Sequence, residues 1–293
     1  MTLSESTLNA GVAVGLSTRP LSGALGAEVL GLDLRQPQDA ATVAALRALW
    51  QANLVIVLRD QQVSAEDQMR FCGYFGPVGK RTRPAEDRAE PDGTPDGMMY
   101  VSNVRVDGKL IGSLPDGEMN FHIDQCYTER PALGTALFAI DVPKRGGDTL
   151  FSNLITAYES LPDAIKRRIE GRKAVHFYDY TSQQRGAVDA RRDDVKHFAH
   201  PIVCTDPASG RKSLFVCRLM TQAIEGLDAA EGGELLEILF DAIERPEVVY
   251  AHKWRPGDLL LWHNRFTAHA RTDFDPSERR HLRRFTITGE RPV

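Results

Sequence analysis

From Met98 onward the chain is dominated by short apolar runs that end in turn residues, and this pattern restricts its fold more than any other feature. Short runs rich in valine, isoleucine, leucine and phenylalanine predict β-strands, whereas helices need longer periodic stretches. We expect strands at 98–106, 119–124, 133–142, 149–152, 200–204, 214–217, 248–253, 259–263 and 282–288. Many short strands with scattered helices indicate a mainly β protein with a β-sandwich or jelly-roll core and helices packed outside it.

Helices are expected at only a few places around these strands. Asp39 can cap a helix that ends near Asn53, and Ser64 with Asp67 resembles a capping box at the start of the next one. The remaining helical patterns are 154–170, which Pro162 divides, and 234–243. Short strands are also expected within 23–34 and at 54–58, and two charged segments, 80–97 and 185–194, are predicted to be loops.

Residues 1–20 are small and polar and have no periodic apolar pattern, so we expect a flexible lead-in there. A single domain should follow over residues 21–293. Apolar residues make up 42% of the chain and charged residues 26%, which is typical of a globular protein. The net charge of −4 is spread along the chain without a basic tract, so nucleic acid is not an expected partner.

The four cysteines are widely spaced and match neither a disulfide framework nor a zinc-finger pattern, so we expect reduced thiols. The N-terminus does not resemble a signal peptide, and no apolar run is long enough to cross a membrane. We therefore expect a cytoplasmic protein without a membrane partner, and we expect it to form a homo-oligomer.

A candidate metal site begins with His122 and Asp124, which lie two positions apart in a predicted strand. Residues i and i+2 of a strand point to the same face, so both side chains could bind one ion. His269, just after the predicted strand 259–263, offers a third ligand. Two histidines and a carboxylate on one face of a metal leave positions open for substrate and O₂, which suits Fe(II) oxygenases, although a hydrolytic zinc site can use the same set. An ordinary strand pair and a core histidine would also explain these residues.

Arginines crowd into the fifteen residues after His269, at positions 271, 279, 280, 283 and 284. A solvated basic face is the usual explanation of such a cluster. However, Arg280 and Arg284 lie at the approach to and inside an alternating segment, so some of these side chains must point towards a buried face. Buried guanidinium groups need anions, which indicates an anion or a carboxylate nearby.

These residues fall into four motifs that occur in a fixed order. The motifs are His122-x-Asp124, Gly146-Gly147-Asp148-Thr149-Leu150, Trp262-x-Asn264-Arg265 with His269, and Arg279-Arg280-x-x-x-Arg284. Together they resemble the taurine dioxygenase and 2,4-dichlorophenoxyacetate dioxygenase family of Fe(II)/2-oxoglutarate enzymes, over about residues 21–291. The resemblance implies a double-stranded β-helix, a jelly-roll form, with iron at its open mouth.

The resemblance also implies cofactors and residue roles. The metal would be Fe(II), with 2-oxoglutarate as cosubstrate and O₂ as oxidant. His122, Asp124 and His269 match the family's iron ligands, while Thr149 and Arg280 match the pair that holds the distal carboxylate of 2-oxoglutarate. The implied reaction oxidises a C–H bond and releases succinate and CO₂, and cleavage follows where the hydroxylated carbon carries a heteroatom.

Arg284 matches the arginine that binds the sulfonate in the taurine enzyme, and this match favours a small anionic substrate. From their position just past the ligand strand, Gln125 and Tyr127 are further expected substrate contacts. The segment between Phe75 and Tyr100 lacks the substrate-binding histidine and tyrosine of the taurine enzyme, which puts taurine itself in doubt.

A second departure is His263, which stands where the family usually has aspartate. We considered it as a ligand, but His269 holds the family's position and its separation from Arg280. Two other classes of protein remain as alternatives. One is a zinc hydrolase that uses the same three ligands, and the other is a non-catalytic metal-stabilised binding protein, which would have no use for Thr149 and Arg280.

Overall fold

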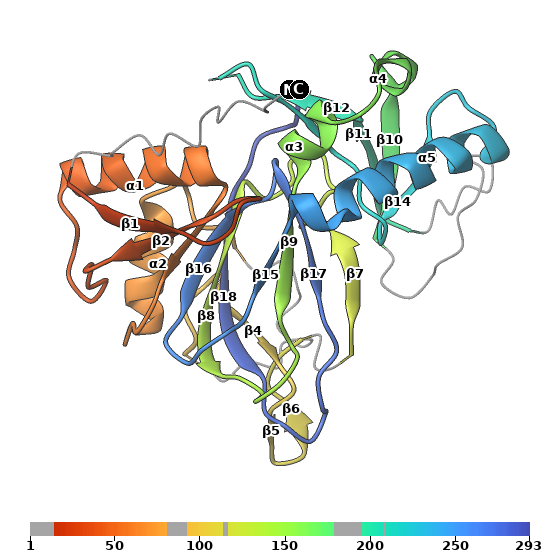
Figure 1. The fold of residues 1–293 in the computed structure, drawn as a ribbon. Coiled ribbons are helices and arrows are strands. Elements are labelled where there is room, and N and C mark those ends of the chain that lie inside the picture. The colour runs from red at the N-terminus through yellow and green to blue at the C-terminus, as the bar shows by residue number, and fades with distance from the viewer. Residues whose placement is uncertain (1–14, 81–92, 114–116, 179–194, 208) are drawn as a thin grey trace.

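The structure is a computed structural model that describes residues 15–80, 93–113, 117–178, 195–207 and 209–293. Two β-sheets that face each other form its centre (Figure 1). The larger sheet contains, in order across it, β1 (Ser17–Pro20), β2 (Ala27–Leu30), β3 (Val55–Leu58), β16 (Leu259–His263), β8 (Gly134–Asp141), β18 (His281–Ile287) and β4 (Met99–Ser102). The smaller sheet contains β15 (Val249–His252), β9 (Thr149–Asn153), β17 (Thr267–Arg271) and β7 (Met119–His122). This arrangement confirms the predicted mainly β jelly-roll core.

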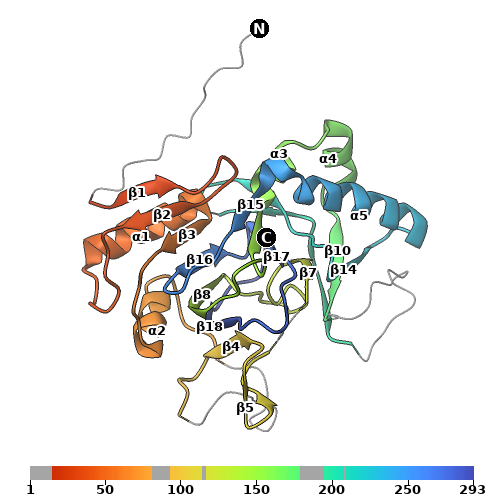
Figure 2. The same cartoon turned by 60° about the horizontal axis from the view of Figure 1, so that its bottom comes forward.

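The central strands of the larger sheet are buried on both faces, which explains why their sequences are continuously apolar. On β16, Leu260 and Trp262 pack between the two sheets, whereas Leu259 and Leu261 pack on the outer face. The outer face is covered by the helices α1 (Ala40–Asn53) and α2 (Ala65–Gly73) (Figure 2). Alternation along each strand therefore decides whether a side chain faces the helices or the space between the sheets.

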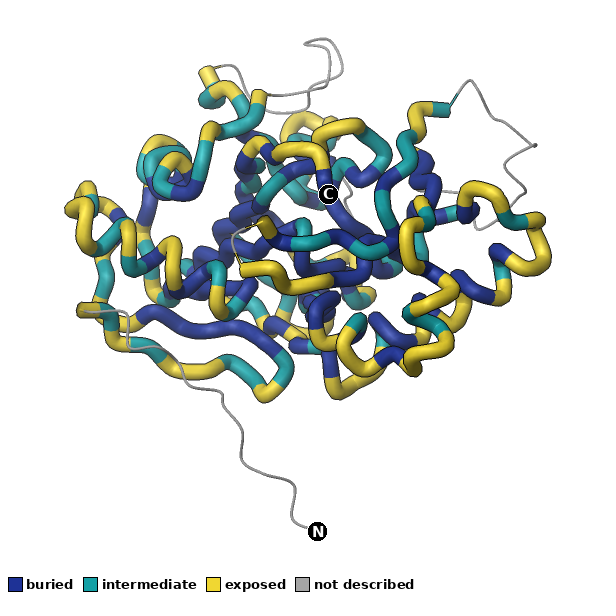
Figure 3. Tube along the Cα trace, turned by 90° about the horizontal axis from the view of Figure 1, so that it is seen from above, coloured by how far each residue is buried: buried dark blue, intermediate teal, exposed yellow. Residues whose placement is uncertain are grey.

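A further layer covers the smaller sheet on its outer face. Its helices are α3 (Leu154–Glu159), α4 (Asp163–Ile169) and α5 (Ala229–Glu244), and the short 3₁₀ helix η2 (Pro246–Val248) follows α5. Its strands are β10 (Lys173–Phe177), β11 (His197–Pro201), β14 (Thr221–Ile224), β12 (Val203–Thr205) and β13 (Lys212–Leu214). A small hairpin, β5 (Arg105–Val106) and β6 (Lys109–Leu110), stands apart from these layers. Buried residues run through the centre of this arrangement, and exposed ones lie on its outer helices and turns (Figure 3).

The predicted helices are confirmed, but α5 begins at Ala229, five residues before the predicted start at residue 234. The side chain of Asp39 accepts a hydrogen bond from the Thr42 amide at 2.7 Å, and Ser64 with Asp67 forms the predicted capping box. The break at Pro162 separates α3 from α4. No helix in the described part of the chain is long and apolar enough to span a membrane.

Several predicted boundaries are wrong. The lead-in does not extend to residue 20, because Ser17–Pro20 pairs with Ala27–Leu30 as an antiparallel hairpin. Strands β10, β14 and β17 were not predicted, strand 119–124 stops at His122, and 98–106 and 200–204 each divide into two strands. Residues 215–217 continue as a loop after β13. The lead-in residues 1–14, the loop 185–194 and most of the loop 80–97 lie outside the described residues.

Arg283 corrects the expectation that a buried guanidinium needs an anion. Its side chain lies on the outer face of β18, where Nε donates to Gln68 Oε1 at 2.7 Å and Nη2 donates to the carbonyl oxygens of Val63 and Ser64. The Gln68 amide in turn donates to the carbonyl oxygens of Arg283 and Ala136. This network, in which neutral oxygens accept from the arginine cation, fastens α2 to the larger sheet.

We predict that Gln68→Leu lowers the free energy of unfolding by about 2 kcal/mol, because it leaves the buried Nε of Arg283 without an acceptor. The matched control is Gln62→Leu, which changes an exposed glutamine six positions earlier and should shift stability by less than about 0.5 kcal/mol. Urea unfolding followed by circular dichroism measures both. Equal effects of the two substitutions would contradict the proposed network.

Candidate active site

Two of the candidate ligands are direct neighbours across paired strands. His122 on β7 lies opposite His269 on β17 in the antiparallel register, and the centroids of their rings are 4.0 Å apart. On the next strand, His269 lies opposite Phe151, which packs between the two sheets. Cross-strand partners share a face, so both imidazoles project into the space between the sheets.

Asp124 reaches the same place from a turn and not from the strand. Because β7 ends at His122, the prediction that both residues share a strand face is wrong in its detail. The turn from Asp124 to Tyr127 includes Gln125 with a φ of 58°, in the left-handed region. It brings Asp124 Oδ1 to 3.9 Å from His269 Nε2. One ligand atom from each of the three residues lies within 4.8 Å of the others.

A chain of hydrogen bonds fixes the orientation of the Asp124 carboxylate. The indole N–H of Trp262 donates to Asn264 Oδ1 at 2.8 Å, and the Asn264 amide donates to Thr135 Oγ1 at 2.9 Å. Thr135 Oγ1 donates to Asp124 Oδ2 at 2.6 Å. Oδ2 is therefore engaged by the protein, while Oδ1 faces the histidines. The Trp262-x-Asn264 motif thus acts on the carboxylate through Thr135.

The protonation states of the three residues suit a divalent cation. His122 Nδ1 lies 3.0 Å from the carbonyl oxygen of Asn120, which can only accept, so Nδ1 carries the proton and Nε2 keeps its lone pair. Burial lowers the pKa of both His122 and His269 and keeps the rings neutral. Burial alone would raise the pKa of Asp124, but the Arg284 cation and the hydrogen bond from Thr135 outweigh it and hold this pKa well below its usual range. Two neutral imidazoles and one carboxylate are a donor set that fits Fe(II).

A pocket opens beside these ligands. It is lined by Val101, Met119, His122, Asp124, Leu137, Thr149, Trp262, His269, Ala270, Arg271, Arg280 and Arg284. Of the residues predicted from sequence, it brings together the three ligands, Thr149, Arg280 and Arg284. Gln125 and Tyr127 do not line it, and the ring of Tyr127 instead lies against that of Tyr178, with 4.8 Å between centroids.

The Gly146-Gly147 pair explains how Thr149 and Arg280 meet at one end of the pocket. Gly146 has a φ of 73°, and a Cβ atom there would lie 2.2 Å from the carbonyl oxygen of Asp273. At Gly147 a Cβ would lie 3.2 Å from Arg280 Nε, which donates to the Gly147 carbonyl oxygen. Only glycine allows this close approach, so the motif places the guanidinium beside the start of β9.

Arg280 is a buried cation that forms no ion pair among the described residues. Its residue exposure is 2%, and Nη1 has no hydrogen-bond partner among the described residues. Burial, followed by the nearby Arg271 charge, lowers the pKa of Arg280 to about 9, although the Asp148 charge offsets part of this lowering. Thr149 Oγ1 accepts from the indole N–H of Trp254 at 2.9 Å, which leaves its own proton available to donate. This end of the pocket therefore fits a carboxylate that receives a charge-assisted hydrogen bond from Arg280.

Arg284 occupies the side of the pocket nearest the candidate ligands. It lies on the inner face of β18, one position from the outward-facing Arg283, and its Nη2 is 2.8 Å from Asp124 Oδ2. Its Nε is buried without a partner in the described structure. The cation thus has hydrogen-bonding capacity that Asp124 alone does not fill.

His263 is not part of this site, as the sequence comparison with His269 predicted. It follows Trp262 on β16 and therefore points to the outer face, where its ring stacks on Trp50 with 4.5 Å between centroids and also contacts Phe266. Burial, with a smaller contribution from the Arg265 charge, lowers the pKa of His263 to about 3.

Thr135 and Trp254 were not predicted from the sequence, and Asn264 appeared only as part of a motif, with no role assigned to it. Thr135 lies in the middle of a predicted strand and carries no signal of its own. Trp254 follows the predicted strand 248–253, and only the pairing of β15 with β9 brings it to Thr149. Both contacts depend on sheet register, which a single sequence does not reveal.

Comparisons with known proteins identify the family to which the chain is similar. The family model described as taurine catabolism dioxygenase TauD, TfdA family matches residues 17–286. The (S)-phenoxypropionate/alpha-ketoglutarate-dioxygenase of Sphingobium herbicidovorans is 32% identical, over 92% of this chain and 94% of that protein. The alpha-ketoglutarate-dependent 2,4-dichlorophenoxyacetate dioxygenase of Cupriavidus pinatubonensis is also 32% identical, over 94% and 98%. A crystal structure of a taurine dioxygenase from Burkholderia xenovorans superposes with a TM-score of 0.78 at 28% identity, over 95% of this chain and 92% of that one.

We predict that His263 makes the protein less stable in mild acid. An unfolded chain protonates this histidine below about pH 6.5, whereas the folded protein does so only near pH 3, so stability is lost as the pH falls between these values. From pH 7 to pH 5 this residue should remove about 2 kcal/mol. His263→Phe keeps the stacking and should reduce the difference between urea unfolding curves at the two pH values.

The control for this substitution is His197→Phe at an exposed histidine, which should keep the wild-type pH dependence. Identical pH dependence in His263→Phe and the wild type would contradict the interpretation.

Proposed function

Because this chain belongs to the taurine catabolism dioxygenase (TauD, TfdA) family, we propose that it oxidises a small anionic organic substrate at an Fe(II) ion held by His122, Asp124 and His269. It is an Fe(II)- and 2-oxoglutarate-dependent dioxygenase that consumes O₂ and releases succinate and CO₂. Its overall reaction thus follows from the family, while the roles of individual residues and the nature of the substrate are our proposals.

The ligand assignment is supported by the convergence of three donors whose remaining polar atoms face elsewhere. His122 presents Nε2 because Nδ1 donates to a backbone carbonyl, and Asp124 presents Oδ1 because Oδ2 accepts from Thr135. Each of these contacts orients a ligand before any ion binds, which lowers the cost of ordering the site. Bound together, Fe(II), 2-oxoglutarate and O₂ supply the oxidising power that attacks a C–H bond.

The observation that carries the proposal is the buried guanidinium of Arg280, whose Nη1 has no hydrogen-bond partner among the described residues. A buried cation without a counter-ion is costly, and Arg280 lines the pocket that the candidate iron ligands also line. A dianionic cosubstrate such as 2-oxoglutarate accounts for it, since one carboxylate can accept from Arg280 and Thr149 while the 2-oxo acid end reaches the metal. A zinc hydrolase or a non-catalytic binding protein would leave this cation without a role.

We further propose that Arg284 binds the anionic group of the substrate; any contact of Gln125 and Tyr127 with its remainder would lie beyond the pocket lining, since neither residue lines the pocket. Phenoxypropionate, 2,4-dichlorophenoxyacetate and taurine, the compounds named for the relatives, each carry a carboxylate or a sulfonate. The spare Nε of Arg284 suits such a group, and the ion pair with Asp124 keeps the guanidinium beside the metal. The substrate would then lie between the metal and the turn at Gln125.

The pocket residues also limit the access of water. Phe151 and Trp262 pack around His269, with ring centroids 6.3 Å and 4.7 Å from its own. Val101, Met119 and Leu137 add apolar side chains to the pocket lining. We infer that these groups hold the reacting carbon near the metal and exclude solvent from the oxidation step.

Three wider predictions stand as proposals. We propose that residues 21–293 act as a single dioxygenase domain, in agreement with a family match that spans nearly all of it. We propose a cytoplasmic location, which four free cysteines suit. The homo-oligomer expected from the sequence remains a prediction that size-exclusion chromatography with light scattering would test.

We predict that anaerobic addition of Fe(II) and 2-oxoglutarate to the protein produces the weak visible charge-transfer band of the chelate. Arg280→Gln should raise the concentration of 2-oxoglutarate needed for half of this band by roughly 30-fold, because about 2 kcal/mol of charge-assisted hydrogen bonding is lost. Arg279→Gln, at the exposed neighbouring arginine that pairs with Asp141, is the matched control and should change little. Absence of the band in the wild type would overturn the proposed function.

We also predict that Arg284→Ala weakens binding of the substrate more than that of the cosubstrate. Small carboxylates and sulfonates would first be screened for substrate-dependent release of succinate. With the compound so found, Arg284→Ala should raise KM at least tenfold, while the 2-oxoglutarate requirement changes by less than about threefold. Arg279→Ala again serves as the control. An unchanged substrate KM in Arg284→Ala would rule out the proposed role of this residue.

A further inference from the structure

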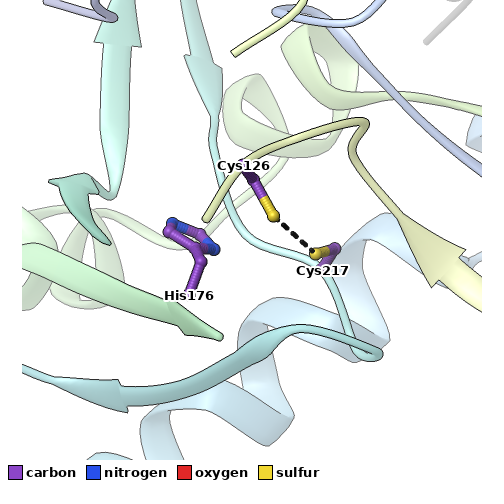
Figure 4. Close-up of side chains that lie close together, drawn as sticks. All are labelled: Cys126, His176 and Cys217. Carbon is purple, nitrogen blue, oxygen red and sulfur yellow. Dashed lines mark hydrogen bonds between the residues drawn. The ribbon is translucent and has the colours of Figure 1, made fainter. Parts of the chain in front are cut away.

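A second cluster of metal-binding side chains lies in the core behind the turn that carries Asp124. Cys126 comes from that turn, His176 from β10, and Cys217 from the loop after β13. Their side chains point towards one another from three separate segments (Figure 4). One ligand atom from each lies within 4.8 Å of the others, and the two sulfur atoms are 4.0 Å apart.

The neighbours of the cluster add soft and polar contacts. Cys126 Sγ lies 3.5 Å from Met220 Sδ, so a thioether adjoins the thiol pair. Thr221 Oγ1 lies 2.9 Å from His176 Nδ1 and accepts from the backbone N–H of Cys217 at 2.9 Å. All five residues are buried to 1% exposure or less. The cluster is therefore sealed from solvent and fixed by hydrogen bonds.

We propose that Cys126, His176 and Cys217 form a structural site for a thiophilic divalent cation, Zn²⁺, separate from the iron site. Two sulfur ligands on a tetrahedral zinc at about 2.3 Å lie about 3.8 Å apart, so the observed 4.0 Å needs a shift of only about 0.2 Å. Two thiolates and a neutral imidazole also bring the total charge with Zn²⁺ to zero. That neutrality matters because an unbalanced charge in an apolar core is strongly unfavourable.

The fourth position of a tetrahedral ion falls to a group already in contact with one of the three ligands. Met220 Sδ is the candidate, because it adjoins Cys126 and offers a lone pair in a site that water does not reach. The two metal sites differ in donor chemistry. Sulfur donors select zinc at this cluster, whereas the imidazole and carboxylate donors of His122, Asp124 and His269 suit iron.

An ion here would brace the turn that aims Asp124. That turn is held by backbone hydrogen bonds from Cys126 to Ile123 and from Thr128 to Gln125. A bond from Cys126 to an ion shared with β10 and the β13–β14 loop would tie it to three segments of the core at once. The site is thus structural. Removal of the ion should lower the free energy of unfolding more than it affects the oxidation reaction.

Cobalt(II) loading tests this site, because thiolate–cobalt bonds give an intense near-ultraviolet charge-transfer band that the iron site, without sulfur, does not produce. The full-length protein, stripped of metal by a chelator and kept anaerobic with a non-thiol reductant, should bind two equivalents of Co²⁺ and show the band. Cys217→Ser should lose the band and one equivalent. Cys204→Ser, at a buried cysteine outside the cluster, is the control and should keep both.

A variant with both His122→Ala and His269→Ala should lose the other equivalent and keep the band, which separates this proposal from the proposed function. Circular dichroism establishes that each variant is folded, and His176→Gln, which spares both sulfurs, should shift the band without removing it. The wild-type spectrum decides the matter even if Cys217→Ser fails to fold. No thiolate band at saturating Co²⁺, or a full band in folded Cys217→Ser, would overturn the proposal.

Discussion

The antiparallel pairing of β7 with β17 is the constraint on which the rest of the site depends. It sets His122 opposite His269, so the spacing of two ligands is fixed by the backbone hydrogen bonds of a sheet and not by flexible side chains. The same sheet continues through β9, which brings Thr149 opposite Arg271 on the face that carries His269. Two of the candidate ligands and Thr149 therefore lie on one sheet, while the turn after β7 adds Asp124 and the facing sheet adds Thr135, Arg284 and the Arg280 loop.

The charged side chains that line the pocket differ in how far neighbouring protein groups compensate them. Asp124 is the one carboxylate among the residues that line the pocket, and it is shared between Thr135, Arg284 and the position of the metal. Arg280 has no such partner in the described structure. A bound dication would balance the Asp124 carboxylate, and a dianionic cosubstrate would balance the Arg280 guanidinium.

The sequence allowed the ligands and the cosubstrate pair to be named because each lies in a short motif with its own chemistry. It did not reveal Thr135 or Trp254, whose contacts arise from strand register between distant segments. Strand alternation could have separated Arg283 from Arg284 and His263 from Trp262, since in each pair one side chain faces the helices and the other the pocket. Strand β10 escaped prediction because it precedes a polar, charged segment, and β14 escaped because it is only four residues long.

The hydrogen bond from Trp254 to Thr149 has a consequence for discrimination between ligands. The indole N–H occupies a lone pair of the Thr149 hydroxyl oxygen, and the Arg280 guanidinium carries only N–H donors. This end of the pocket therefore mainly donates hydrogen bonds. A carboxylate, which only accepts, satisfies it fully. The corresponding carboxamide has two N–H hydrogens, and this end of the pocket offers few acceptors for them. An indole that never touches the ligand thereby helps the pocket to distinguish an acid from its amide.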